Sequence, residues 1–317
     1  MAWVTVGNPG NAADTEVMST DGTTGYGGVD YAYRIGKYEV TTDQYTEFLN
    51  AVAATDANGL YAAYIISTRN GITRNGWSGS YRYSAKPHMG NKPVNFVSWY
   101  DALRFANWLH NGQPAGEQDA STTEDGVYDM SLGASVVRKP GARVWLPSED
   151  EWYKAAYYEP AASGNDYWTY GTRSDDVPTV ATANSVGDIS NPAANVANYN
   201  FGADWNGQDG NLTSVGSAGS FSESYYGAAD MTGNVWEWNE TLVGSSRGLR
   251  GGSWDDSYPY YLQSSFRSYF EPTHEYCFLG FRVAAIPEPG TATLSIAGLL
   301  CLLCWRRRRG GFLVTKR

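Results

Sequence analysis

The chain has 317 residues and a formal net charge of −10, which is enough length for one large domain or two small ones. Hydrophobic residues make up 42%, but the chain holds 24 Tyr, 12 Trp and 36 Gly and only 18% charged residues. This composition predicts loop-rich packing, with aromatic side chains filling an irregular core and glycines turning the backbone. Residues 286–317 carry six Lys or Arg and one Glu, so the net charge of the rest is −15, which argues against a nucleic-acid partner. An acidic body suits an exported protein, a cation binder or simply a soluble surface.

Three segments have the pattern of amphipathic helices. In the first, the apolar side chains from Tyr45 to Val52 repeat at helical spacing and form one stripe. The other two open with a hydroxyl residue followed three positions later by an acidic one, which is the spacing of a capping box. The predicted helices are residues 42–53, residues 98–110 with the pair Ser98 and Asp101, and residues 146–158 with the pair Ser148 and Glu151.

The rest of the body predicts short strands among Gly, Asn, Ser and Asp turns. The strand-like runs are Val40, Val144–Trp145 and Phe281–Ala284. Residues 111–142 and 160–195 are polar and weakly patterned, which predicts surface loops or insertions. Because the composition does not shift until about residue 286, we predict one domain over residues 30–285, with residues 1–29 packing on it and a separate tail.

Six motifs follow one another through the body, and together they resemble the formylglycine-generating enzyme family, also called the sulfatase-modifying factor domain. The motifs are IGKYEVTTDQYTEFLN (35–50), KPVNFVSWYDALRFANWL (92–109), RVWLPSEDEWYKAAYY (143–158), ADMTGNVWEWNE (229–240), LRGGSW (249–254) and LGFRVA (279–284). The resemblance implies an α+β fold: a single compact domain, related to C-type lectins, with little regular secondary structure.

The same resemblance implies two calcium sites, since Ca²⁺ takes six to eight hard oxygen ligands. The first would use the side chains of Asp230 and Glu237 with the carbonyls of Gly233 and Val235, and the second Asn198 with the carbonyl of Tyr199, and Asp209 with the carbonyl of Asn211. From the residues alone, Asp230 and Glu237 are as well explained by hydrogen bonds to turns. On either side of Glu237, Trp236 and Trp238 are expected to belong to the core and not to stack on a ligand.

The sequence differs from the family at the residues that carry out the family's reaction. Members of the family use two cysteines, five residues apart, to bind Cu(I) and activate oxygen; counted from the GGSW motif, those positions hold Asp256 and Tyr261. Carboxylate and phenol are poor ligands for Cu(I), so copper is not expected and no catalytic residue is assigned. Cys277 is a lone thiol, and the remaining two cysteines, Cys301 and Cys304, lie in the apolar tail.

We therefore expect a binding or structural module with a ligand groove over residues 250–278, whose ligand is unknown or a surface polymer. The groove residues are Ser253, Asp255, Asp256, Tyr258 and Tyr261, where Ser253 matches a serine that lines the family's substrate groove. An ordinary solvated loop would explain the Asp and Tyr residues as well. The alternative function is an oxidoreductase, either formylglycine-generating or with another activity in the same groove.

The C-terminal tail, residues 286–317, has the features of a sorting signal. Pro287-Glu288-Pro289 is followed by an apolar run of 16 residues from Gly290 to Trp305 and then by Arg306–Arg309. As a helix this run is about 24 Å long, against a hydrocarbon core of about 30 Å. The order of PEP, apolar helix and arginines resembles the PEP-CTERM signal of Gram-negative bacteria; a plain tail anchor is the alternative.

That resemblance implies transient association with the inner membrane, processing by an exosortase-type protease, and export to the cell surface or beyond. The first residues, MAWVTVGNPGNAADTE, show no basic stretch and no apolar run, so no signal peptide is visible. We expect that the true start of the protein lies upstream of Met1.

Overall fold

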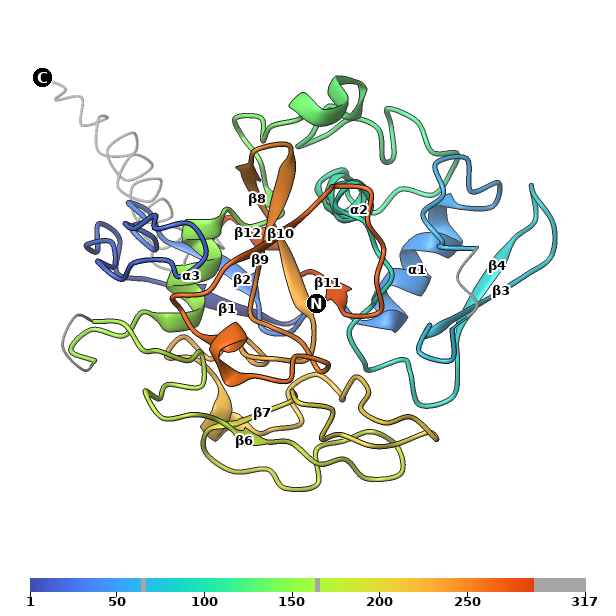
Figure 1. Cartoon of the computed structure of the whole chain (residues 1–317). Helices are drawn as coiled ribbons and strands as arrows, with labels where there is room; N and C mark the ends of the chain where they lie inside the picture. Colours follow the sequence, from blue (N-terminus) through green and yellow to red (C-terminus); the bar gives the residue numbers. More distant parts are fainter. Residues whose placement is uncertain (64–66, 163–165, 288–317) are drawn as a thin grey trace, which may run out of the picture.

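The computed structural model describes residues 1–63, 67–162 and 166–287, and within them short elements are joined by long loops (Figure 1). The α-helices in this part of the chain are α1 (Thr42–Val52), α2 (Trp99–His110) and α3 (Glu149–Tyr157). The single-turn 3₁₀ segments are η1 (Met130–Ser135), η2 (Ser220–Ser222) and η3 (Pro259–Leu262). The fold is thus a mixed α and β fold with few helices, as the sequence predicts.

Two small four-stranded sheets form the framework. The first is antiparallel throughout, in the order β1 (Trp3–Val6), β2 (Tyr33–Gly36), β12 (Ala284–Ala285) and β5 (Val144–Trp145). The second has the order β10 (Ser268–Phe270), β9 (Ser246–Arg250), β8 (Trp236–Val243) and β11 (Leu279–Gly280), with only the β8–β11 pair parallel. Two further pairs are the hairpin β3 (Ile72–Asn75) and β4 (Arg82–Ala85), and the parallel pair β6 (Thr179–Val180) and β7 (Val196–Ala197).

Each α-helix begins where a capping box satisfies its free backbone donors. The Ser98 hydroxyl accepts the amide of Asp101, and the Asp101 carboxylate accepts the amide of Ser98 at 2.9 Å. Ser148 and Glu151 repeat the arrangement at α3, so both predicted capping pairs are confirmed. The helices are the predicted ones to within three residues at each end.

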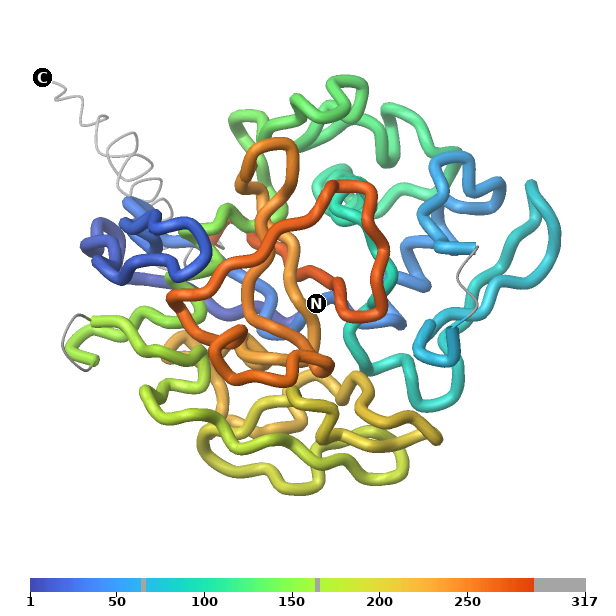
Figure 2. Tube along the Cα trace, viewed as in Figure 1, coloured from blue at the N-terminus to red at the C-terminus, as the bar shows by residue number. Residues whose placement is uncertain are grey.

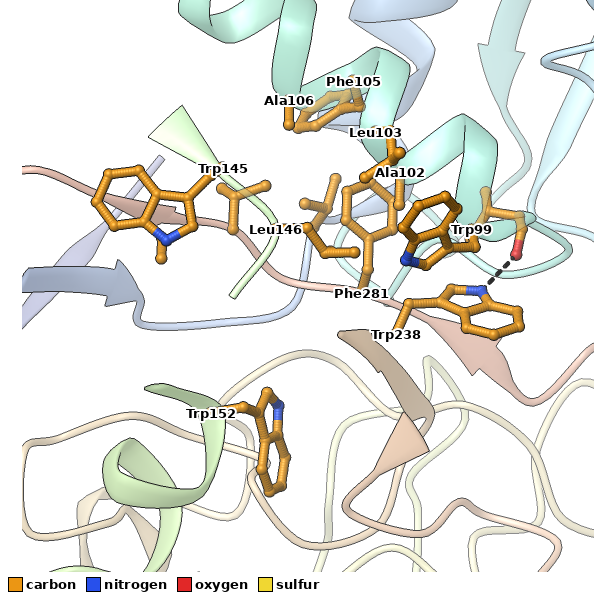
Figure 3. Packing of buried hydrophobic residues seen from close by; sticks show 14 of the residues in the cluster. Trp99, Ala102, Leu103, Phe105, Ala106, Trp145, Leu146, Trp152, Trp238 and Phe281 are labelled. Carbon is orange, nitrogen blue, oxygen red and sulfur yellow. Dashed lines mark hydrogen bonds between the residues drawn. The ribbon is translucent and has the colours of Figure 1, made fainter. Parts of the chain in front are cut away.

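The core lies between α1, α2 and α3 and the two sheets, and aromatic rings fill it (Figure 3). Trp238 is fully buried, and its indole N–H donates to the carbonyl of Val97 at 3.0 Å. Trp99 donates in the same way to the carbonyl of Asn239. Each indole therefore buries a large apolar surface without leaving its donor unpaired. Trp236 is 5% exposed and also belongs to this cluster, so the prediction that both tryptophans are core residues is confirmed.

Three expectations from the sequence need correction. Of the predicted strand-like run Phe281–Ala284, only Ala284 lies in a strand, β12. Residues 111–142 are not only a surface loop, because Val127, Tyr128 and Val136 are buried in the core cluster. Val40 lies outside any strand; its amide donates to the carbonyl of Phe281 instead. No helix among the described residues is long and apolar enough to cross a membrane, and the predicted apolar helix of the tail lies outside them.

Candidate functional site

The turn after β9 builds the floor of the site. Gly251 and Gly252 have φ angles of 101° and 75°, a region that glycine adopts readily, and they turn the chain sharply after Arg250. Ser253 follows and is fully buried. Its hydroxyl lies 2.7 Å from a carboxylate oxygen of Asp255 and 2.8 Å from one of Asp256, and its amide donates to the same Asp256 oxygen at 2.7 Å. Ser253 thus holds two neighbouring carboxylates in place from below.

After the floor, the chain continues through η3 to β10, in the orange part of the tube in Figure 2, and a buried arginine fixes this segment. Arg250, at the end of β9, donates to the carbonyls of Ser264 and Phe266 at 2.8 Å each. Its guanidinium also pairs with Glu149 at the start of α3, and Arg267 reaches the same carboxylate at 2.5 Å. These contacts tie the loop between η3 and β10 to a helix and a strand, so the site stands on a rigid base.

Between the floor and the segment from η3 to β10 lies a pocket of about 250 Å³. Its lining residues are Trp236, Asp255, Asp256, Tyr261, Phe266, Ser268, Phe270 and Phe278. Of the five predicted groove residues, Asp255, Asp256 and Tyr261 line this pocket and Ser253 lies beneath it. Tyr258 does not line it; this ring is 61% exposed and stacks on Tyr260 at 5.9 Å.

The sequence interpretation missed the wall formed by β10 and its approach. Phe266, Ser268 and Phe270 alternate with residues that face away, and Arg267 between them pairs with Glu149 on the other side. This period of two is the signal that places three side chains on one face of a strand. The alternation was missed in the sequence because the strand, Ser268–Phe270, is only three residues long.

The two carboxylates of the floor lie in a partly buried environment that disfavours their charged form. Burial raises the pKa of Asp256 to about 6, with the negative charge of Asp255 adding to the effect and hydrogen bonds from Ser253 opposing it. Burial also raises the pKa of Asp255, although the positive charge of Arg69 works against this. Within the described part of the chain, neither carboxylate forms an ion pair.

Cys277 lies beside this site but offers no reactive thiolate. It packs, partly buried, against a small cluster that includes Trp254. Burial, with the negative charge of Asp255 as a second cause, raises the pKa of the thiol to about 11. The thiol therefore stays protonated at neutral pH and is a poor nucleophile and metal ligand.

The first predicted calcium set, Asp230 to Glu237, surrounds an arginine. Glu237 is fully buried and binds the guanidinium of Arg282 through both oxygens, at 2.6 and 2.5 Å. One of these oxygens also accepts the indole N–H of Trp152. Asp230 accepts the amide of Gly216 at 2.5 Å, and burial raises its pKa to about 6. An ion here would have to displace Arg282 from Glu237, so these side chains fit calcium poorly as they stand.

The backbone of this loop is nevertheless tightly constrained. Gly233 has a φ of 81°, and a Cβ at this position would lie 2.3 Å from the carbonyl oxygen of Asn198. Its amide donates to the carbonyl of Gly251, which joins the loop to the floor of the pocket. Val235 is fully buried in the small cluster that holds Trp254. The loop therefore serves packing whether or not an ion binds.

The second predicted calcium set fits better. The side-chain oxygen of Asn198 is buried and has no hydrogen-bond partner, while its amide nitrogen lies 2.9 Å from the carbonyl of Asn211. Tyr199 is buried and donates its hydroxyl to Pro178. Asp209 is exposed, and its carbonyl accepts Arg69. The unpartnered side-chain oxygen of Asn198 is the kind of hard oxygen ligand that calcium takes, whereas the Asn211 carbonyl already accepts the Asn198 side-chain nitrogen. Even so, no described group of three or more His, Cys, Asp or Glu side chains is arranged to hold a metal.

The two sets are parts of one buried polar network. The amide of Asn198 donates to the side-chain oxygen of Asn234 at 3.1 Å, and Asn234 donates to Glu39 at 3.0 Å. Glu39 in turn lies 4.0 Å from Arg282, and its second oxygen has no hydrogen-bond partner. Burial raises the pKa of Glu39 well above the usual value, and the neighbouring Asp230 is the next cause.

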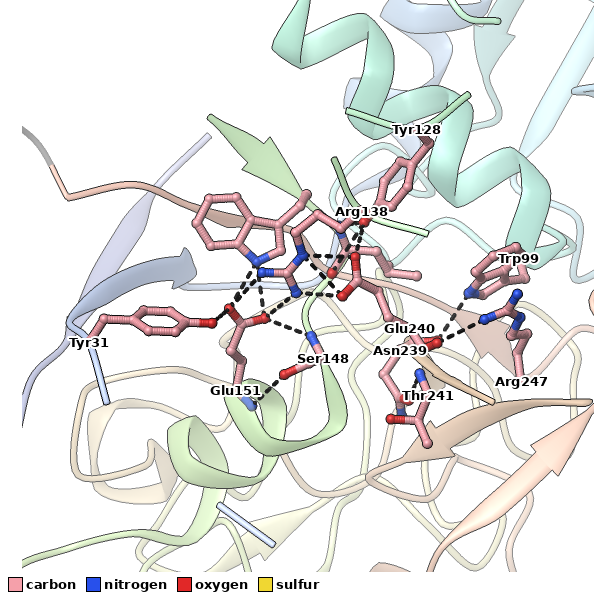
Figure 4. A network of polar contacts seen from close by, with 12 residues as sticks. Tyr31, Trp99, Tyr128, Arg138, Ser148, Glu151, Asn239, Glu240, Thr241 and Arg247 are labelled. Atoms are coloured by element: carbon pink, nitrogen blue, oxygen red, sulfur yellow. Dashed lines mark hydrogen bonds and ion pairs between the residues drawn. The ribbon is translucent and has the colours of Figure 1, made fainter. Parts of the chain in front are cut away.

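A separate network around Arg138 stabilises the opposite end of β8 (Figure 4). The Arg138 guanidinium contacts Glu151 at 2.8 Å and Glu240 at 2.5 Å. Glu151 also accepts the hydroxyl of Tyr31 and the indole of Trp145. The network joins residues 111–142 to α3 and β8, which explains why that polar segment is anchored to the core.

Comparison with known proteins places this geometry in context. The family model described as "Sulfatase-modifying factor enzyme 1-like domain" matches residues 14–286. A hercynine oxygenase of Mycobacterium tuberculosis is 26% identical over 280 residues, which cover 80% of this chain and 52% of that protein. One from Mycolicibacterium thermoresistibile is 32% identical over 218 residues, covering 61% of this chain and 36% of that protein. The chain thus spans only about a third to a half of these relatives.

Solved structures support the fold. CarF superposes with a TM-score of 0.52 at 20% identity, covering 91% of this chain and 99% of that one. Variable protein 1 of Treponema denticola gives 0.50 at 21% identity, with 90% and 95% covered. PvdO of Pseudomonas aeruginosa gives 0.50 at 18% identity, with 90% and 94% covered. At these identities the likeness speaks for the fold alone.

Proposed function

Given that the chain belongs to the family of sulfatase-modifying factor enzyme 1-like domains, we propose that it uses this scaffold as a binding module and not as a thiol-dependent oxidase. The observation that carries the proposal is the composition of the pocket. Asp256 and Tyr261, at the positions we align with the family's cysteines, both line it, and no cysteine does. Cys277, the cysteine that lies within the described residues, is held protonated by burial.

The chemistry follows from these groups. A Cu(I) site needs soft thiolate ligands, and the pocket offers two carboxylates and a phenol, which are hard oxygen donors. The residues at the site therefore do not fit copper, and no oxidation step is derived through it. What the pocket does offer is shape, aromatic surface and negative charge, which are properties used in binding.

The test measures copper affinity and cysteine oxidation together. The purified body, residues 1–286, which lacks the two cysteines of the tail, should bind Cu(I) no better than a single exposed thiol and should convert no sulfatase-type cysteine peptide to the aldehyde. The variant carrying both Asp256→Cys and Tyr261→Cys is the control, because a gain of copper affinity would support the alignment of these positions. Aldehyde formation by the unmodified protein, detected by mass spectrometry, would refute the proposal.

A second candidate function is an oxidoreductase, and the relatives named hercynine oxygenase favour it. Such an activity would need a metal, and the three histidines of the chain, His88, His110 and His274, lie far apart in the sequence. Oxygen consumption in the presence of iron and a thiol substrate distinguishes the two candidates. Turnover above the rate of the metal alone would favour the oxygenase.

We also propose that calcium stabilises the domain. The support is the buried, unpartnered side-chain oxygen of Asn198, so this set is the better candidate, although Asp230 with Glu237 belongs to the same network. When bound, the ion would be held by Asn198 and Asn211 and would supply positive charge to a network rich in carboxylates. Melting temperatures measured with calcium and with a chelator test whether calcium stabilises the domain.

Export and sorting by the tail belong to the same proposal. The apolar run from Gly290 to Trp305 between PEP and the arginines supports a transient inner-membrane anchor that an exosortase-type protease removes. Intact-mass analysis of protein extracted from the surface of the native host should show loss of the residues beyond about 287–290. Full-length protein that persists in the membrane fraction would favour a plain anchor.

A further inference from the structure

The walls of the pocket at Asp256 combine two properties that together select a ligand class. Of the eight lining residues, five are aromatic: Trp236, Tyr261, Phe266, Phe270 and Phe278. The other three are Ser268 and the two carboxylates of the floor, so no basic side chain lines the pocket. A site of this composition repels anions and attracts positive charge.

The aromatic residues of the pocket pack against one another in two groups. Tyr261 packs edge-on against Phe266 with ring centroids 4.9 Å apart, and Phe266 contacts Trp236 at 6.0 Å. Phe270, on the same wall as Phe266, lies 6.1 Å from Phe278. Aromatic rings attract cations through their quadrupole, by about 0.5–1 kcal/mol at exposed sites and about 2 kcal/mol or more when the cation is desolvated.

The carboxylates of the floor form no ion pair among the described residues, although Asp256 also accepts a hydrogen bond from the Trp236 side chain. The hydrogen bonds from Ser253 to Asp256 converge on one oxygen, and Ser253 reaches a single oxygen of Asp255. The nearest positive charge that acts on Asp255 is Arg69, but its guanidinium stacks on Trp254 at 4.5 Å. Arg69 also donates to the carbonyls of Asp209 and Gly210 instead of to the carboxylate.

We propose, building on the function proposed above, that this pocket binds an organic ammonium cation with apolar substituents, the charge facing Asp255 and Asp256 and the substituents facing the aromatic walls. The volume of about 250 Å³ fits such a group. At about 30 Å³ per water, it equals roughly eight water molecules, the size of a small organic cation. An alkylated ammonium leaves water more easily than a primary one, because it has fewer hydrogen bonds to lose.

A neutral sugar is less well matched to these walls. Sugar hydroxyls need several donors and acceptors, and the pocket offers only Tyr261, Ser268 and the two carboxylates as polar groups. Phenylalanine supplies three of the eight lining positions and can make no such bond. Charge and apolar contact, not hydroxyl recognition, are therefore the interactions that this surface is built to make.

The experiment compares choline with dimethylbutanol, its neutral carbon isostere, which has the same shape and lacks the charge. Binding to the full chain is measured by calorimetry or by ligand-observed NMR at constant ionic strength. We expect choline to bind on the order of tenfold more tightly than the isostere. Equal affinity of the two, or no binding of choline up to high millimolar concentration, would overturn the inference.

Two variants locate the effect. Asp256→Asn should weaken choline binding on the order of tenfold by removing one facing charge. Asp176→Asn is the matched control, because it makes the same change of charge at an exposed residue outside the pocket, and it should leave the affinity unchanged. Equal weakening by both would show a general surface effect and refute the site. If Asp256→Asn does not fold, Asp255→Asn takes its place.

Two sources can present such a group: a free small molecule, or the side chain of a methylated lysine in a peptide. A peptide with one trimethyllysine forms the second arm, and the same peptide with unmodified lysine is its control. Tighter binding of choline than of the methylated peptide assigns the free molecule, and the reverse order assigns a peptide. If the protein forms no aldehyde and also binds no choline, the inference of an ammonium site is refuted, whereas the proposed binding module is not.

Discussion

Replacing Arg282 with methionine tests the idea that one buried guanidinium holds the domain together. Arg282 is fully buried, pairs with Glu237 through two bonds, and donates to the carbonyls of Gly36 and Ala229 at 3.1 and 3.0 Å. It therefore joins β2, β8 and the loop before β8. Methionine fills similar space without charge, and it leaves Glu237 buried with only the indole of Trp152. Removing one partner of a buried ion pair costs about 3–5 kcal/mol.

The assay is urea unfolding followed by tryptophan fluorescence, with the free energy extrapolated to water. A loss of about 3–5 kcal/mol should lower the melting temperature by on the order of 10 °C for a domain of this size. Adding Glu237→Gln to Arg282→Met should recover part of the loss, because the orphaned charge is then gone. A change below about 1 kcal/mol for Arg282→Met would refute the reasoning, and so would a double variant less stable than the single one.

Three further outcomes follow from the same structure. Burial raises the folded-state pKa of Asp256 to about 6, so the folded chain binds more protons than the unfolded chain between about pH 4 and 6. The free energy of unfolding should therefore fall as pH rises through that window. Asp256→Asn, which keeps an oxygen for Ser253, should gain up to about 3 kcal/mol of stability at pH 7 in urea titrations and should flatten the pH dependence. Calcium at a hundredfold excess over its dissociation constant should raise the free energy of unfolding by about 2.7 kcal/mol, which would raise the melting temperature several degrees above that measured in chelator. Asn198→Ala should abolish this rise. Identical melting temperatures of the parent protein with calcium and with chelator would refute the site. Gly233→Ala should lower the free energy of unfolding by more than about 1–2 kcal/mol in the same urea assay, because it adds a left-handed backbone penalty to a clash with Asn198. Gly244→Ala is the control, because φ is 62° there but nothing lies within 4 Å, so it should show the backbone penalty alone.

The helices were predictable because their signals are local. Ser98 with Asp101 and Ser148 with Glu151 are spaced so that each side chain reaches the other's backbone amide, and this geometry depends on four consecutive residues only. The same signature at Thr41 and Gln44 also starts a helix and was open to the same inference. Local hydrogen bonding thus defined the three longest helices of the described chain.

The hairpin of β8 and β9 was not predictable in the same way. Residues 236–239 are buried on both faces, so the alternation that marks a half-exposed strand is absent. The ion pair of Glu237 with Arg282 joins residues 45 positions apart, and the contact of Arg250 with Glu149 spans 101 positions. Such pairs depend on the finished fold, which is why the Arg282 partner of Glu237 could not be predicted from the sequence.

The aligned positions themselves suggest how a binding pocket can follow from an oxidase scaffold. Ser253 is held by a buried turn and makes its contacts through backbone and hydroxyl, so it can position whatever residue stands three places later. With a carboxylate at Asp256, the same serine stabilises a negative charge that burial would otherwise disfavour. Tyr261 contributes an aromatic wall where a second soft ligand would be needed for copper. Under the proposed function, two changes at these positions would replace affinity for a soft metal with affinity for a positive charge, while Arg250 and Arg282 keep the frame in place. The choline comparison and the copper titration examine the two halves of this exchange separately.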